Sequence, residues 1–188
     1  MLTHKGTQTI ETERLILRRF TMEDAEPMFR NWASDDAVTK YLTWPTHAGV
    51  EITKLVLTDW IGSYHKPDFY NWAIILKENG SEPIGSIAAV HINPKTNCAT
   101  MGYCMSRTHW GKGIMAEALS ALIDFFFGEV GINRIEADHD PNNPKSGKVM
   151  KKSGMTYEGT MRQAGLSNQG IIDVSRWAIL RSGWEEKR

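Results

Sequence analysis

The chain is short of the features that would place it in a specialised class of protein. Its 188 residues include only two cysteines, Cys98 and Cys104, which are too few for a disulfide framework and lack the spacing of a metal site. We therefore expect reduced thiols and no bound metal. No apolar run has the length of a membrane-spanning helix, and the chain does not open with a charged region followed by an apolar one. These absences predict a cytoplasmic protein with no membrane partner.

An excess of charge is also absent. The 22 Lys and Arg residues are balanced by 22 Asp and Glu residues, so the formal net charge is +0. Without a general basic field, nothing favours a nucleic acid as partner. There is no internal repeat and no low-complexity stretch. At this length we expect a single domain over residues 1–188, with a loosely ordered polar arm over residues 1–12.

Apolar periodicity predicts a chain in which strands and helices alternate. The expected order is β, α, α, three antiparallel strands, α, β, α, β, β, which indicates an α/β (α+β) fold. Its mixed, mostly antiparallel sheet should have helices on both faces. Strands are predicted at 15–17, 70–77, 83–92, 99–106, 134–139, 157–162 and 171–180. Helices are predicted at about 21–32, 35–41, 49–65, 114–127 and 143–154, and a loop over 165–170 should join the last two strands.

The stretch from Thr108 to Ala121 places Gly111 and Gly113 directly before an amphipathic helix. The first N–H groups of a helix have no partner within it, and a phosphate group can accept from them. A nucleotide P-loop is excluded because Gly113, not Ser or Thr, follows Lys112. Two interpretations stay open, a dinucleotide fingerprint and the diphosphate loop of an acyl-coenzyme A enzyme. The antiparallel strands expected before the loop argue against the dinucleotide.

Gly102 lies in the middle of the fourth predicted strand. A glycine at such a position suggests a bulge or a close approach of other atoms to the backbone. A bulge here would splay the fourth strand, 99–106, from the fifth, 134–139. The sequence therefore predicts a slot between these two strands in which backbone N–H groups face a ligand.

Several separated motifs resemble the GNAT N-acetyltransferase superfamily, and more narrowly its RimJ/RimL-type branch. The resemblance runs from the ETERLILR opening to Ser182-Gly183-Trp184. Its most specific part is the pattern N-x-x-S-x-x-V-x-x-K-x-G followed by an apolar residue. That pattern is matched here at Asn143, Ser146, Val149, Lys152, Gly154 and Met155, beside Gly111-Lys112-Gly113, Glu117-Ala118-Leu119, Glu158-Gly159 and Asp173.

The resemblance implies acetyl-coenzyme A as co-substrate and a primary amine as acceptor. The acceptor would be a protein N-terminus, as in a ribosomal protein, or a small molecule, and the enzyme a monomer or homodimer. The pantetheine arm would pair with the backbone of Tyr103, Cys104 and Met105, like an added strand. Its amide would bind the Asn143 side chain. The diphosphate would lie on Trp110, Gly111, Lys112, Gly113 and Ile114. A basic cluster suited to the phosphates comprises His109, Lys112, Lys145, Lys148, Lys151 and Lys152.

The catalytic groups depart from the family pattern. The tyrosine that many GNAT enzymes use to protonate the departing thiolate falls at Met150, so the resemblance implies Ser146 as the hydroxyl donor. The family's Gln or Arg at the start of the loop is Thr108, and no carboxylate lies near Gly165. Imidazole chemistry makes His139 the leading candidate for the general base. Glu136, Asp138, His91 and a water chain remain alternatives, and so do two other functions, a non-catalytic acyl-coenzyme A module and a dinucleotide-binding oxidoreductase.

Overall fold

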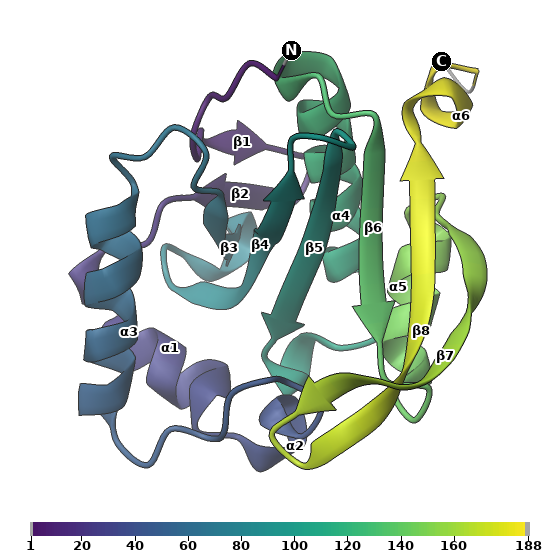
Figure 1. The fold of residues 1–188 in the computed structure, drawn as a ribbon. Helices are drawn as coiled ribbons and strands as arrows, with labels where there is room; N and C mark the ends of the chain where they lie inside the picture. Colours follow the sequence, from purple (N-terminus) through teal and green to yellow (C-terminus); the bar gives the residue numbers. More distant parts are fainter. Residues whose placement is uncertain (1, 187–188) are drawn as a thin grey trace.

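A computed structural model describes residues 2–186 and contains one eight-stranded mixed sheet (Figure 1). The strand order is β1-β2-β3-β4-β5-β6-β8-β7. Every neighbouring pair is antiparallel except β5 and β6, which run parallel. The strands are β1 (Ile10–Glu11), β2 (Leu15–Arg18), β3 (Asn71–Leu76), β4 (Pro83–Asn93), β5 (Cys98–Met105), β6 (Arg134–His139), β7 (Thr156–Ser167) and β8 (Gly170–Leu180). The helices are α1 (Ala25–Met28), α2 (Asp36–Thr39), α3 (Val50–Ser63), α4 (Ile114–Phe125), α5 (Pro144–Lys152) and α6 (Arg181–Glu185).

The predicted splay lies between β5 and β6. Their register runs from Cys98 opposite Arg134 to Met101 opposite Ala137 and ends there. The two strands then diverge, as Figure 1 shows, with α5 behind β8. The fold class predicted from the sequence is confirmed, including this break between the fourth and fifth predicted strands.

The bulge is in a different strand from the one the sequence suggested. The register shifts in β4, between Ala89 and His91, rather than in β5. Gly102 on β5 meets the displaced residue, because a Cβ at Gly102 would lie 2.8 Å from Cγ1 of Val90. Gly102 therefore provides space for a side chain of the neighbouring strand.

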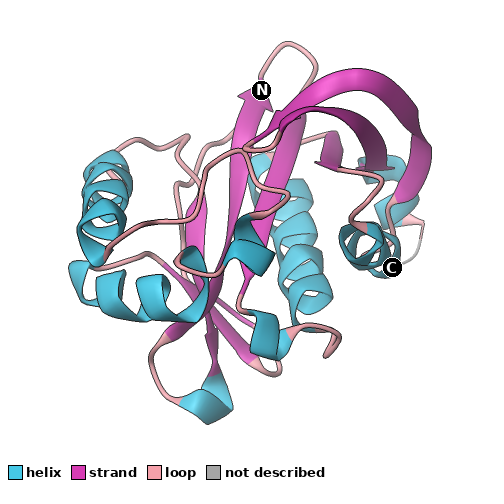
Figure 2. Ribbon diagram, turned by 90° about the horizontal axis from the view of Figure 1, so that it is seen from below, coloured by secondary structure: helices cyan, strands magenta, loops and turns pink. Residues whose placement is uncertain are grey.

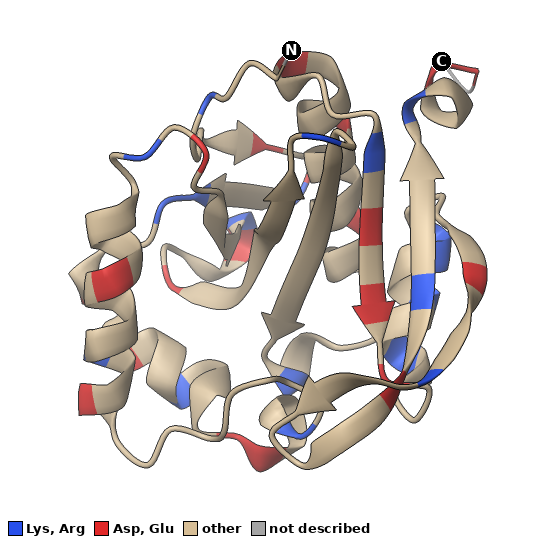
Figure 3. Cartoon of the chain, in the orientation of Figure 1, with Lys and Arg blue, Asp and Glu red and all other residues tan. Residues whose placement is uncertain are grey.

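Two apolar clusters pack on the two faces of the sheet, and Figure 2 shows helices on both sides of it. Neighbouring residues of β3 divide between them, since Trp72 and Ile74 face α4 while Ala73 and Ile75 face α1 and α3. Helices on both faces were predicted. On the α1–α3 side the helices do not reach β6 and β8, along which Figure 3 shows charged residues.

The N-terminal arm and the predicted loop over 165–170 are both more ordered than predicted. The arm before β1 is docked rather than loose, since the Lys5 N–H donates to the Tyr70 hydroxyl and Thr7 Oγ1 to the Phe69 carbonyl. Met1 lies outside the described residues. The closing loop predicted over 165–170 is also wrong. Strands β7 and β8 run on to Ser167 and Gly170, because a two-residue turn suffices. Strand β1 and helix α6 were not predicted.

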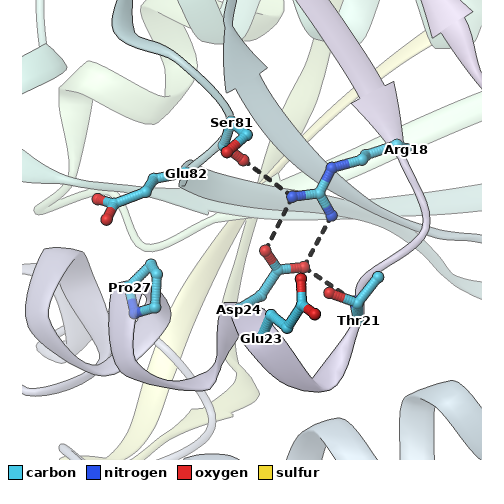
Figure 4. Close-up of a pocket in the computed structure, with 7 residues that line it drawn as sticks. All are labelled: Arg18, Thr21, Glu23, Asp24, Pro27, Ser81 and Glu82. Carbon is cyan, nitrogen blue, oxygen red and sulfur yellow. Dashed lines mark hydrogen bonds and ion pairs between the residues drawn. The ribbon is translucent and has the colours of Figure 1, made fainter.

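An open pocket of about 380 Å³ on the α1 side contains a structural ion pair (Figure 4). The Arg18 guanidinium holds the Asp24 carboxylate through two bonds of 2.7 and 2.8 Å. It also donates to the carbonyls of Arg19 and Ser81. The Asp24 carboxylate in turn accepts from the Thr21 N–H at 2.8 Å. Because both terminal nitrogens of Arg18 are engaged, the pocket offers little to a ligand. The ion pair instead joins β2, the start of α1 and the β3–β4 turn.

Replacing Asp24 with alanine should lower the free energy of unfolding by about 2–4 kcal/mol, because it leaves a partly buried guanidinium without its counter-ion. The side chains of Arg18 and Asp24 are 25% and 5% exposed, so the effect falls somewhat below that of a fully buried pair. Urea unfolding measures it. The matched control is Glu82→Ala, which breaks an ion pair to Arg30 whose side chains are 58% and 55% exposed for Arg30 and Glu82 respectively. That change should lower stability by less than about 1 kcal/mol. Equal losses in both variants would contradict the structural role of Asp24.

Candidate active site

The turn before α4 presents a row of unpaired main-chain donors. Gly111 and Gly113 have φ values of 79° and 76°, in the left-handed region that glycine enters without strain. Within residues 2–186, no backbone N–H from Gly111 to Ala116 donates to another backbone group, and Glu117 is the first to do so, to the Gly113 carbonyl at 3.1 Å. A Cβ at Gly111 would meet no atom within 4 Å. The turn is therefore an open cradle into which an anion fits.

The C-terminal part of β5 offers main-chain groups to the splay, although not at every residue predicted. The Ser106 N–H donates to the Ile84 carbonyl, so the backbone of Ser106 faces β4. Alternation along the strand turns Cys104 toward β4 as well, opposite Ser86, and turns Tyr103 and Met105 toward the splay. Of the three residues expected to pair with pantetheine, the geometry favours Tyr103 and Met105. Cys104 is buried, and burial raises the pKa of its thiol to about 11.

The end of the slot is closed by Trp110. Its indole N–H donates to the Met105 carbonyl at 2.8 Å, and the Lys145 ammonium lies 4.6 Å from the centre of its ring. This cation–π contact brings the first turn of α5 to the loop before α4. Among the lysines that α5 contributes to the predicted basic cluster, Lys145 is thus one that contacts the loop.

Asn143 occupies the N-cap position of α5 without acting as a side-chain cap. Pro144 follows at the first helical position, as predicted. The Asn143 side chain makes no cap hydrogen bond, although its N–H donates to the Asp140 carbonyl at 2.7 Å. The amide group is therefore left available to an amide of another molecule.

Ser146, in the first turn of α5, is held by a residue of β5. The Tyr103 hydroxyl donates to the Ser146 carbonyl at 3.1 Å, and its oxygen lies 2.9 Å from Ser146 Oγ in a contact where either hydroxyl can be the donor. Burial raises the pKa of the Tyr103 hydroxyl, although the bond with Ser146 lowers it in part. The Ser146 hydroxyl is therefore held in hydrogen-bond contact with a buried tyrosine hydroxyl. The sequence analysis assigned Tyr103 a backbone role only, and no sequence signal indicated this side-chain contact.

His139 has both ring nitrogens engaged. Nδ1 lies 2.8 Å from the Asp140 carbonyl oxygen, and Nε2 accepts from the indole N–H of Trp177 at 3.2 Å. A Cβ on Gly147 of α5 would lie 2.7 Å from Nε2. To act as a general base, His139 would first have to lose the bond from Trp177. Its catalytic role stays a prediction.

A pair of substitutions tests that role. Because both nitrogens are engaged, we expect His139→Ala to lower kcat by less than tenfold, whereas loss of a general base lowers it by about 10²–10⁴-fold. The matched variant is Trp177→Phe, which frees Nε2 and retains the imidazole. For a structural histidine, the two variants should show similar kcat values and similar losses of thermal stability. A large loss confined to His139→Ala would establish it as the base.

The other candidates for the base also have partners. The Asp138 carboxylate accepts two bonds from Arg176, at 2.9 and 2.8 Å. Glu136 accepts from Thr100 at 3.1 Å and from Arg134 at 3.1 Å. His91, Thr100, Arg134 and Glu136 line a pocket of about 240 Å³ on the uncovered face of the sheet. Among residues 2–186, no group of three or more His, Cys, Asp or Glu side chains could hold a metal ion.

The tip of the β7–β8 hairpin reaches the segment between α2 and α3. Its Asn168 N–H donates to the Leu42 carbonyl at 2.8 Å. The Asn168 side-chain amide donates to the carbonyls of Thr39 and Trp44, at 2.8 and 2.9 Å. These bonds join the two segments that flank the diverging end of β5 (Figure 1). The sequence gave no indication of Asn168, because the contact spans more than a hundred residues.

Comparison with known proteins gives a consistent result. Residues 14–156 match the family model of the acetyltransferase (GNAT) domain. The chain is 33% identical over 174 residues to an uncharacterised N-acetyltransferase, p20, of Bacillus licheniformis, across 93% of this chain and 97% of that protein. It is 27% identical to the ribosomal-protein-serine acetyltransferase of Escherichia coli, across 92% and 96% respectively. A GNAT-family acetyltransferase structure from Bacillus anthracis superposes with a TM-score of 0.82, at 26% identity, across 93% and 99%. Within residues 2–186, the structure contains no helix whose length and hydropathy would let it span a lipid bilayer.

Proposed function

Because the chain belongs to the acetyltransferase (GNAT) family, we propose that it transfers the acetyl group of acetyl-coenzyme A to a primary amine, with a protein N-terminus as the first candidate. The observation that carries this proposal is the splay of β5 from β6, which opens between the donor-rich turn before α4 and the first turn of α5. The ribosomal acceptor is suggested by the name of the relative from Escherichia coli. Two buried free thiols support a cytoplasmic location.

The residues present fit acetyl-coenzyme A, which supplies an activated thioester when bound. The N–H groups from Gly111 to Ile114 would hold its diphosphate. The backbone of Tyr103 and Met105 would pair with the pantetheine arm from one side of the splay, and the Asn143 amide from the other.

The proposed chemistry needs a donor for the developing charge and a route for two protons. Main-chain N–H groups of β5 would stabilise the carbonyl oxygen as it becomes negative. The Ser146 hydroxyl, in the first turn of α5, would donate a proton to the departing sulfur, where the helix N-terminus also favours negative charge. Tyr103, bonded to Ser146 at 2.9 Å, would hold that hydroxyl in place. The ammonium proton of the acceptor would leave to His139 or through water, and the second nitrogen proton, lost as the amide forms, would replace the one that Ser146 gives to the sulfur.

The test is thiol release from acetyl-coenzyme A with a panel of peptides bearing each N-terminal residue, beside polyamines and other small amines. Mass spectrometry of the products should place the acetyl group on the α-amine, and N-terminally blocked peptides should give no release. If only small amines were acetylated, the acceptor would be a small-molecule amine and not a protein N-terminus. Binding of coenzyme A without turnover of any amine would indicate a non-catalytic module. The dinucleotide interpretation is set aside, because an antiparallel strand pair precedes the glycine turn.

A further inference from the structure

The turn before α4 is anchored by residues near the N-terminus of the chain. The Glu117 carboxylate, in the first turn of α4, accepts from Thr12 Oγ1 at 2.6 Å and from the Arg14 N–H at 3.0 Å. It also accepts from Nε and Nη2 of Arg14, at 2.7 and 2.6 Å. The remaining terminal nitrogen of Arg14 donates to the carbonyl of Lys112, between the two glycines, at 3.1 Å.

The bond to the Lys112 carbonyl sets the direction of the next donor. In a trans peptide the carbonyl oxygen and the following N–H point to opposite sides, and the residues described contain no cis peptide bond. When Arg14 holds the Lys112 oxygen, the Gly113 N–H is turned away from Arg14. That N–H is one of the unpaired donors of the cradle.

Glu117 would interfere with anion binding if it were left alone. A carboxylate in the first turn of a helix is attracted to the same N–H groups and the same dipole that attract a phosphate, and it repels the phosphate directly. Burial by itself raises the pKa of the Glu117 carboxyl, but the bonds from Thr12 and Arg14 lower it overall. The carboxylate therefore stays charged, and Arg14 balances that charge.

Folding stability alone does not account for this arrangement. The Arg14 and Glu117 side chains are 43% and 20% exposed, so solvent reduces what their ion pair contributes to stability. We infer that Arg14 and Glu117 are positioning residues for the diphosphate turn, in which Arg14 neutralises Glu117 and fixes the Lys112 peptide. This inference rests on the proposed acetyl-coenzyme A site.

The experiment compares Arg14→Met, Glu117→Gln and the double variant by titration calorimetry with coenzyme A. Arg14→Met leaves Glu117 charged and unbalanced beside the turn, so it should raise Kd by about tenfold or more. Glu117→Gln removes an anchor without adding repulsion and should have a smaller effect. The double variant should bind more tightly than Arg14→Met alone, since its second substitution removes the repelling charge. Arg30→Met, at an exposed ion pair with Glu82, is the control and should leave Kd unchanged.

A truncated substrate separates positioning from general damage. S-acetylpantetheine lacks the diphosphate, so Arg14→Met should leave its kcat/KM unchanged while raising KM for acetyl-coenzyme A. Equal losses with both substrates, or additive losses in the double variant, would overturn the inference. The calorimetry needs no acceptor. Failure of the wild-type protein to bind coenzyme A would refute the proposed function, whereas tight binding that all variants retain would refute this inference alone.

Discussion

Replacing Ser146 with alanine should lower kcat by about 10²–10⁴-fold, the range typical of a lost general acid, and leave the Kd of coenzyme A nearly unchanged. The hydroxyl stands in the first turn of α5, 2.9 Å from that of Tyr103. Met150, which follows one turn later on the same helix, is buried and has no proton to donate. Steady-state kinetics with a saturating acceptor, together with calorimetry, separates the chemical step from binding.

Two further variants make the result specific. Tyr103→Phe keeps the ring and removes the bond to Ser146, so it should lower kcat by about tenfold, the value of one lost hydrogen bond. Ser153→Ala removes a hydroxyl at the opposite end of the same helix, one that lies 3.2 Å from the Ala116 carbonyl oxygen. It should reduce stability slightly and leave kcat unchanged. A Ser146→Ala enzyme with normal kcat would remove the serine from the mechanism and leave the fold assignment intact.

The fold was predictable because each element carries a local signal. Strand β6 was predicted with its observed limits, Arg134–His139, and the start of α5 follows from Asn143-Pro144. The main errors lie where the contacts are long-range. The arm before β1 looked disordered because its order comes from Tyr70 and Phe69, and these contacts leave no periodicity.

The positions of the site residues were predictable, but the hydrogen bonds that their side chains make were not. Sequence placed Ser146 and Asn143 correctly at the head of α5, but it did not indicate the contact between the Ser146 and Tyr103 hydroxyls. It ranked His139 first as base from its residue type and its position at the end of the strand that leads into Asn143, and the structure shows the indole of Trp177 bonded to that ring. Such roles depend on hydrogen bonds between residues far apart in the sequence, and local sequence patterns do not predict these bonds.

A second large effect is expected at Gly113, where alanine should raise the Kd of coenzyme A by more than about tenfold. Two causes add. A left-handed backbone costs an alanine roughly 1–2 kcal/mol, and the new Cβ would stand among the N–H groups that face the diphosphate. In the unliganded protein that Cβ has room, since its nearest neighbour would be Nη2 of Arg14 at 3.7 Å. The obstruction therefore concerns the ligand.

Gly131, at the other end of the same helical segment, supplies the matched control for backbone strain. It has φ 84° and ψ 24°, close to the φ 76° and ψ 0° of Gly113. Gly131→Ala should lower the free energy of unfolding by about as much as Gly113→Ala, because both impose a similar left-handed penalty. Only Gly113→Ala should weaken coenzyme A binding and raise KM for acetyl-coenzyme A. If both variants weakened binding equally, general destabilisation would explain the loss, and the cradle before α4 would no longer account for diphosphate recognition.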